Sequence, residues 1–103
     1  MPAVHMDQKN FDRLVMEEKR TALVDFWSPR CGPCRMLGPV IEAISEEVPA
    51  DVLVAKVDAD QEPGLAQRFG IMAIPTVIAF RDGQELRRTV GLTSKDALLD
   101  LLK

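Results

Sequence analysis

The amino-acid sequence predicts an α/β fold with a mixed β-sheet, and three patterns lead to this prediction. Two apolar runs, at residues 22–27 and 52–57, have the composition of strands that are buried on both faces. Apolar residues at helical spacing follow each run, which gives a β–α–β order. Near the C-terminus, an Asp-Gly dipeptide at 82–83 separates residues 77–80 from residues 86–90, and this dipeptide favours a tight turn between antiparallel strands.

The N-terminal part of the chain is expected to supply an edge strand followed by a helix. Residues 1–6 are short and mildly apolar, which fits a strand at the margin of the sheet. Asp7 can cap a helix in which Phe11, Leu14 and Val15 recur at positions i, i+3 and i+4. We expect this helix to pack against one face of the sheet.

The longest predicted helix begins at Cys31, directly after the first buried strand and a turn at residues 28–30. The apolar face of this helix is formed by Leu37, Ile41, Ile44 and Val48. Pro39 lies inside the same stretch and is expected to kink the helix, because proline removes a backbone hydrogen bond.

Two shorter helices are expected before and after the hairpin. The first has apolar residues between positions 65 and 69 and is expected to end at Gly70. The second begins near Thr93 and Asp96, whose spacing resembles a capping box. Its apolar positions, which fit a helix docked on the sheet, are Ala97, Leu98, Leu101 and Leu102.

Length and composition indicate one globular domain spanning residues 1–103. The chain is 47% hydrophobic and 28% charged, which is the usual balance of a folded domain. A formal net charge of −3 provides no broad positive field, so we expect neither nucleic acid nor a membrane surface as a partner. The sequence has no signal-peptide pattern and no apolar run of membrane-spanning length, and the cytoplasm is the expected compartment.

The only two cysteines, Cys31 and Cys34, stand where the strand pattern changes to a helix pattern. A thiol at a helix N-terminus faces unpaired backbone N–H groups and the positive end of the helix dipole, which favour the reactive thiolate. Residues three apart on a helix have Cβ atoms about 5–6 Å apart, so a small shift brings them to bonding distance. The pair therefore predicts a reversible dithiol/disulfide centre.

Two other interpretations of the cysteine pair are weaker. A structural zinc site needs four ligands, whereas the chain offers two cysteines and one histidine, His5, in the N-terminal segment. We therefore expect no bound metal, and we expect His5 to be an exposed or edge-strand residue. A structural disulfide that closes so short a loop would stabilise the fold little, because the entropic gain grows with loop length.

Asp25 is a carboxylic acid inside an apolar strand, where it either turns to water or stays buried. Burial would raise its pKa, because the charged form loses its hydration. A carboxylate that titrates near neutral pH beneath the cysteine pair can accept a proton from the less exposed thiol, although a structurally satisfied aspartate is the alternative. Lys56, in the second buried strand, can pair with Asp25 and tune its proton affinity, or it can extend to solvent.

Pro75 opens a predicted strand in the sequence Ile74-Pro75-Thr76. Because proline cannot donate to a central ladder, it belongs at the start of the strand or in a special turn, where a cis bond is one option. Trp27, at the end of the first buried strand, can belong simply to the core.

The order and spacing of these residues resemble those of the thioredoxin family over essentially the whole chain. The matching positions are Val24-Asp25-Phe26-Trp27, Cys31-Gly32-Pro33-Cys34-Arg35, Pro39, Ala55-Lys56-Val57-Asp58, Gly70-Ile71, Ile74-Pro75-Thr76, Phe80, Gly83 and Val90-Gly91. A Cys-x-x-Cys pair alone would be weak evidence, whereas the full set in this order is specific.

The resemblance implies a thioredoxin fold, in which a five-stranded or nearly five-stranded mixed sheet is flanked by four α-helices and Pro75 is cis beside the cysteine pair. It implies that Cys31 is the exposed nucleophile and that Cys34 is the buried thiol that resolves the mixed disulfide. Asp25 would assist the proton transfer of Cys34, with Lys56 as its electrostatic partner.

The resemblance also implies partners. In thioredoxins the substrate backbone lies against the loop before the cis-proline and against a later glycine segment. The matching residues of this substrate surface are Ala73, Ile74, Pro75, Gly91 and Leu92, and Trp27 is assigned to it as well. We expect a monomer that binds no cofactor, acts on disulfide-containing proteins, and is itself reduced by a thioredoxin reductase with electrons from NADPH.

Arg30 departs from the family pattern, because a tryptophan usually precedes the first cysteine. Its positive charge is expected to stabilise the Cys31 thiolate and to make the centre more oxidising. A positive rim that favours acidic substrates is the alternative. Gly32 and Pro33, by contrast, resemble the dipeptide of reductants rather than the histidine-containing dipeptides of isomerases and oxidants.

The sequence thus predicts a protein-disulfide reductase that acts by thiol–disulfide exchange. A redox-gated binding module is an alternative, in which the apolar surface near Gly32, Ile74 and Gly91 holds a partner and the thiols gate it. Metal or cluster binding by the two cysteines across a dimer is a third interpretation.

Overall fold

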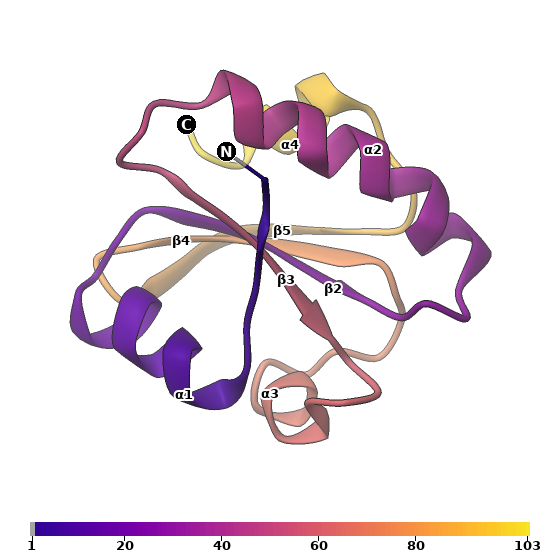
Figure 1. The fold of residues 1–103 in the computed structure, drawn as a ribbon, viewed down its shortest axis with the longest axis horizontal. Coiled ribbons are helices and arrows are strands. Elements are labelled where there is room, and N and C mark those ends of the chain that lie inside the picture. The colour runs from indigo at the N-terminus through magenta and orange to yellow at the C-terminus, as the bar shows by residue number, and fades with distance from the viewer. Residues whose placement is uncertain (1) are drawn as a thin grey trace.

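A central sheet with helices on both faces forms the protein in a computed structural model, which describes residues 2–103 (Figure 1). The five strands follow the order β1-β3-β2-β4-β5. Three of them are parallel to one another, namely β1 (Val4–His5), β3 (Leu53–Asp58) and β2 (Ala22–Trp27). The other two, β4 (Thr76–Arg81) and β5 (Gln84–Val90), complete the sheet in antiparallel pairs. The predicted mixed sheet and the edge strand are confirmed.

The helices divide between the two faces of the sheet (Figure 1). On one face lie α1 (Gln8–Phe11), its continuation η1 (Asp12–Glu17) and α3 (Pro63–Arg68). On the other face lie α2 (Gly32–Glu47) and α4 (Lys95–Asp100). Within residues 2–103, every helix falls short of the length and apolarity that crossing a bilayer requires.

The core consists of two buried clusters, one on each face of the sheet. Under α1 and α3, the Phe11 ring meets the Phe80 ring edge-on, with centroids 5.5 Å apart. Under α2 and α4, the cluster contains Leu23, Leu37 and Leu98. Successive side chains of β2 enter the two clusters alternately, which explains why its sequence is apolar almost without interruption.

The first helix starts as predicted but continues differently. Asp7 accepts a hydrogen bond from the Asn10 backbone N–H at 2.8 Å, and the Asn10 side chain accepts one from the Asp7 N–H, so a capping box is formed. After Phe11 the backbone widens into a π-helix, in which the Glu18 N–H donates to the Arg13 carbonyl. Apolar spacing indicates a helical face but does not distinguish these two helix types.

The C-terminal helix begins one residue later than its capping pattern predicted. Ser94, and not Thr93, is the N-cap, because its hydroxyl accepts a hydrogen bond from the Ala97 N–H at 3.2 Å. The hairpin prediction is confirmed, since Asp82 and Gly83 both have positive φ angles, as a two-residue turn between twisted strands requires. The longest helix, α2, continues through Pro39 to Glu47.

Candidate active site

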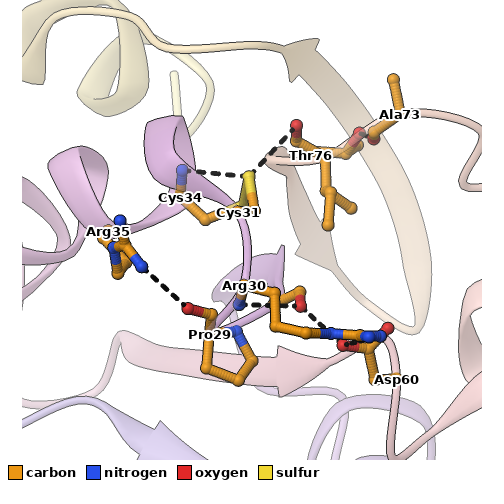
Figure 2. The surroundings of a disulfide bond; sticks show 10 residues. Pro29, Arg30, Cys31, Cys34, Arg35, Asp60, Ala73 and Thr76 are labelled. Carbon is orange, nitrogen blue, oxygen red and sulfur yellow. Dashed lines mark hydrogen bonds and ion pairs between the residues drawn. A yellow bond between two sulfur atoms is a disulfide. The ribbon is translucent and has the colours of Figure 1, made fainter.

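The cysteine pair lies at the carboxyl end of β2, where the chain turns into α2 (Figure 2). Cys31 is the N-cap of α2 and is half-buried, whereas Cys34 is 1% exposed. The two residues are joined as a disulfide, with their Cα atoms 5.2 Å apart. One sulfur therefore faces the surface and the other faces the interior.

Backbone groups surround the outer sulfur. The Cys34 N–H donates a hydrogen bond to Cys31 Sγ at 3.2 Å, and this sulfur lies 3.7 Å from the carbonyl oxygen of Ile74 (Figure 2). Pro33 occupies the first turn of α2, where its missing N–H costs nothing. An N–H donor and the N-terminus of a 16-residue helix both favour negative charge on Cys31.

The predicted substrate loop packs directly against this sulfur. The peptide bond between Ile74 and Pro75 is cis, as the resemblance implied. The Thr76 hydroxyl donates to the Ala73 carbonyl at 2.6 Å, and the Gly91 N–H donates to the Pro75 carbonyl at 2.8 Å. Two segments distant in the sequence are thereby held together beside the cysteines.

Asp25 is buried beneath α2. It is 1% exposed and lies two residues after Leu23 on β2, so it faces the same side of the sheet as that residue, which packs under α2. Among the described residues, no donor reaches either of its carboxylate oxygens. Burial raises the pKa of Asp25 from its ordinary 3.8 to about 7, and the charge of Lys56 partly opposes the rise. Of the two positions that the sequence left open for Asp25, facing water or buried, the structure shows the buried one.

Lys56 stands beside Asp25 in the register of β2 and β3, but it forms no ion pair with it within the described chain. Its ammonium instead lies 4.1 Å from the centre of the Trp27 ring, a cation–π distance. The His5 ring packs against the same tryptophan at 6.2 Å. Trp27 is thus half-buried between polar side chains, and Lys56 acts on Asp25 through its field.

Arg30 is paired with a residue that the sequence interpretation missed. Its guanidinium lies 3.3 Å from an Asp60 carboxylate oxygen, and the buried Ser28 hydroxyl donates to the same oxygen at 2.6 Å. These hydrogen bonds, first from Ser28 and then from Arg30, lower the pKa of Asp60. In Figure 2 the Arg30 side chain runs toward Asp60 and away from the sulfur of Cys31.

A sequence signal for Asp60 existed. It lies just after β3, and Ser28 lies just after β2, while these two strands are parallel neighbours. The carboxyl ends of parallel strands meet at one edge of the sheet, so polar residues following both strands can be expected to come together there.

Comparison with known proteins identifies the family. The model of the family described as Thioredoxin matches residues 2–103. The chain belongs to the thioredoxin family. One relative is Thioredoxin of Mycobacterium tuberculosis, which is 43% identical over 93% of this chain and 83% of the relative. Another is Thioredoxin 1 of Synechococcus elongatus, which is 40% identical over 97% of this chain and 94% of the relative. The solved structure of a mutant thioredoxin from Halobacterium salinarum NRC-1 superposes with a TM-score of 0.88, at 36% identity over 98% of this chain and 88% of that one.

Thioredoxins are protein-disulfide oxidoreductases, and this member carries its cysteine pair in the bonded arrangement that thiol–disulfide exchange requires. The predicted thioredoxin fold is confirmed. Thioredoxins carry no prosthetic group, and residues 2–103 contain no cluster of three His, Cys, Asp or Glu side chains suited to a metal ion. His5 is exposed on the edge strand β1, as expected.

Proposed function

We propose that this chain is a general protein-disulfide reductase in which Cys31 attacks and Cys34 resolves. The observation that carries the proposal is the asymmetry of the pair, since Cys31 is half-exposed and accepts an N–H hydrogen bond while Cys34 is buried. A disulfide in a large substrate can reach only the exposed sulfur. The N–H donor and the helix N-terminus favour the thiolate form at that sulfur.

The exchange proceeds in two balanced steps. The Cys31 thiolate attacks one sulfur of the substrate disulfide, so that a mixed disulfide forms and the other substrate sulfur leaves as a thiolate. Asp25 then accepts the proton of the Cys34 thiol, directly or through water, because its pKa of about 7 matches the working pH. The Cys34 thiolate attacks the Cys31 sulfur, so the Cys31–Cys34 disulfide forms, the mixed disulfide breaks and the second substrate sulfur leaves as a thiolate. The substrate has then gained two electrons, and the cysteine pair has lost two.

The substrate backbone is proposed to lie against the two loops beside Cys31. Its contact residues would be Trp27, Ala73, Ile74, Pro75, Gly91 and Leu92. Support comes from the hydrogen bond that ties Gly91 to Pro75, and from the 48% exposure of the apolar Leu92 at this position. Lys56 is proposed to act through its charge, which lowers the pKa of Asp25 and so opposes part of the rise caused by burial.

Family membership supports a thioredoxin reductase, which draws on NADPH, as the proposed electron source. We propose that the chain acts as a monomer in the cytoplasm and binds no cofactor itself. The test follows NADPH consumption with such a reductase and a protein disulfide. We expect full loss of turnover in Cys31→Ser, and a stable covalent adduct with the substrate in Cys34→Ser. Failure of Cys34→Ser to trap an adduct would reverse the roles of attacker and resolver.

A redox-gated binding module is the second candidate, because the two loops next to Cys31 carry exposed apolar side chains, Met72 at 97% and Leu92 at 48%. Contiguous exposed apolar patches mark docking surfaces on proteins. Replacement of both cysteines by serine separates the two functions. A reductase loses its activity, whereas a binding module keeps its partner and loses only the dependence of binding on redox state.

The ion pair between Arg30 and Asp60 argues against the idea that Arg30 makes the centre more oxidising. A carboxylate 3.3 Å from the guanidinium offsets much of the positive field that would reach Cys31. We therefore propose ordinary reductase behaviour, and we expect the Cys31 pKa of Arg30→Trp to stay close to that of the parent. A large rise in that pKa would restore the oxidising interpretation.

A further inference from the structure

Arg30 has most of its hydrogen-bonding capacity left over. Its side chain is 83% exposed, and its ion pair with Asp60 uses one terminal nitrogen. A guanidinium carries five N–H donors in a planar fork that matches a carboxylate. Within residues 2–103, Asp60 is the only acidic side chain bonded to it.

Asp60 holds this guanidinium in place. Its carboxylate accepts from the buried Ser28 hydroxyl at 2.6 Å, and its own N–H donates to the Asp58 carboxylate at 2.9 Å. The lowered pKa of Asp60 keeps it ionised at neutral pH. A long side chain that is already anchored loses less conformational entropy when it binds a partner.

A second arginine lies on the same rim of the cysteine pair. Arg35, in the first turn of α2, is exposed and donates to the Pro29 carbonyl at 3.4 Å. In Figure 2, Arg30 and Arg35 lie on either side of Pro29. We call Pro29, Arg30, Arg35 and Asp60 the basic rim, because two positive charges there face one negative charge.

The opposite rim of the site carries no charge. It is formed by Ala73, Ile74, Pro75, Gly91 and Leu92, all of which are uncharged. Selection among substrates by charge close to Cys31 therefore depends on the basic rim.

We propose that Arg30, supported by Arg35, binds a carboxylate that flanks the target disulfide in a substrate protein. An Asp or Glu side chain next to the attacked cysteine would accept a charge-assisted, forked hydrogen bond from the free edge of the guanidinium. The chain thereby selects disulfides in acidic segments. This inference rests on the proposed reductase function and deepens it, since it names the chemistry of the preferred substrate.

The test compares two disulfide-bonded peptides that differ only by Glu or Gln beside the attacked cysteine. The readout is the ratio of the second-order rate constants with which the reduced protein acts on them. We expect a ratio of about 3–10 in favour of the Glu peptide at low salt, falling as salt screens the charges. Arg30→Gln should bring the ratio to the intrinsic value of the peptides.

Arg13→Gln is the matched control, because Arg13 is an exposed arginine of η1, on the far face of the sheet, with an acidic neighbour at 4.0 Å. It removes the same charge and should leave the ratio at the parental value. Equal ratios in the parent and Arg30→Gln would overturn the inference. If both proteins still reduced the Gln peptide, the proposed function would stand. Failure of the parent to reduce either peptide would instead overturn the proposed function, and the inference with it.

Discussion

Two aspartates near the cysteine pair have opposite surroundings. Asp25 is buried in β2 without a donor to either oxygen, and its pKa is raised to about 7. Asp60, in the loop after β3, accepts hydrogen bonds from Ser28 and Arg30, and its pKa is lowered. The carboxyl group of Asp25 can therefore exchange a proton near neutral pH, whereas that of Asp60 remains an anion.

The comparison shows that burial and hydrogen-bond donors decide what a carboxyl group can do here. A buried carboxylate without donors binds a proton near neutral pH and can act in acid–base chemistry. A carboxylate with two donors is a fixed charge that can only orient its neighbours.

The largest effect is expected for Asp25→Asn, which keeps the shape of the side chain but cannot accept a proton. The Cys31 attack on an aromatic disulfide reagent such as dithiobis(nitrobenzoate) should keep its rate, whereas the release of the second chromophore by Cys34 should slow about 100-fold at pH 7. Stopped-flow absorbance separates the two phases. Parental rates in both phases would show that Asp25 is not the proton acceptor.

The second effect is on stability. The unfolded chain ionises Asp25 near pH 3.8, whereas the folded chain holds the proton until about pH 7, so unfolding releases a proton between these values. Relative to Asp25→Asn, the parent should therefore lose stability as pH rises from 4 to 7, by about 4 kcal/mol at 1.36 kcal/mol per pKa unit. Denaturant titrations of both oxidised proteins at pH 4, 5.5, 7 and 8 measure the difference. A pH-independent difference would contradict the raised pKa.

A smaller effect is expected for Lys56→Met. The Lys56 charge lowers the pKa of Asp25, so its removal should move the pH midpoint of the Cys34 phase upward. Lys56→Arg keeps the charge and should leave the midpoint near that of the parent. A downward move in Lys56→Met would contradict the electrostatic effect of the lysine on Asp25.

The smallest effect on the chemistry is expected for Asp60→Asn. The Ser28 hydroxyl can still donate to the new amide oxygen, and no proton is exchanged at this position in the neutral range. Both phases of the reagent assay should match the parent from pH 6 to 8. A slowed Cys34 phase would place Asp60 in the proton path and would remove the contrast with Asp25.

Much of the fold and the centre of the site followed from local sequence patterns. The nearly uninterrupted apolar run around Asp25 predicted a strand covered on two faces, and it made burial with a raised pKa one of two options for this residue. The position of Cys31 between strand and helix predicted an N-cap with a donor at its sulfur. Such features depend on neighbours within a few residues.

The missed features depend on long-range geometry or on small energy differences. The contact between Ser28 and Asp60 joins residues 32 apart, and it exists only because β2 and β3 end at the same edge. The choice of Ser94 over Thr93 as a cap is a shift of one residue between two hydroxyl side chains. The ammonium of Lys56 over Trp27 required the three-dimensional positions of both side chains.

The most direct measurement is a carboxyl-carbon NMR titration of the oxidised protein, in which Asp25 and Asp60 are followed in one sample. We predict a midpoint near pH 7 for Asp25 and a midpoint below the ordinary aspartate value for Asp60. Assignment is secured by the loss of one resonance in Asp25→Asn and of the other in Asp60→Asn. A shared midpoint near pH 4 would contradict the proton-acceptor role of Asp25 and the contrast between the two groups.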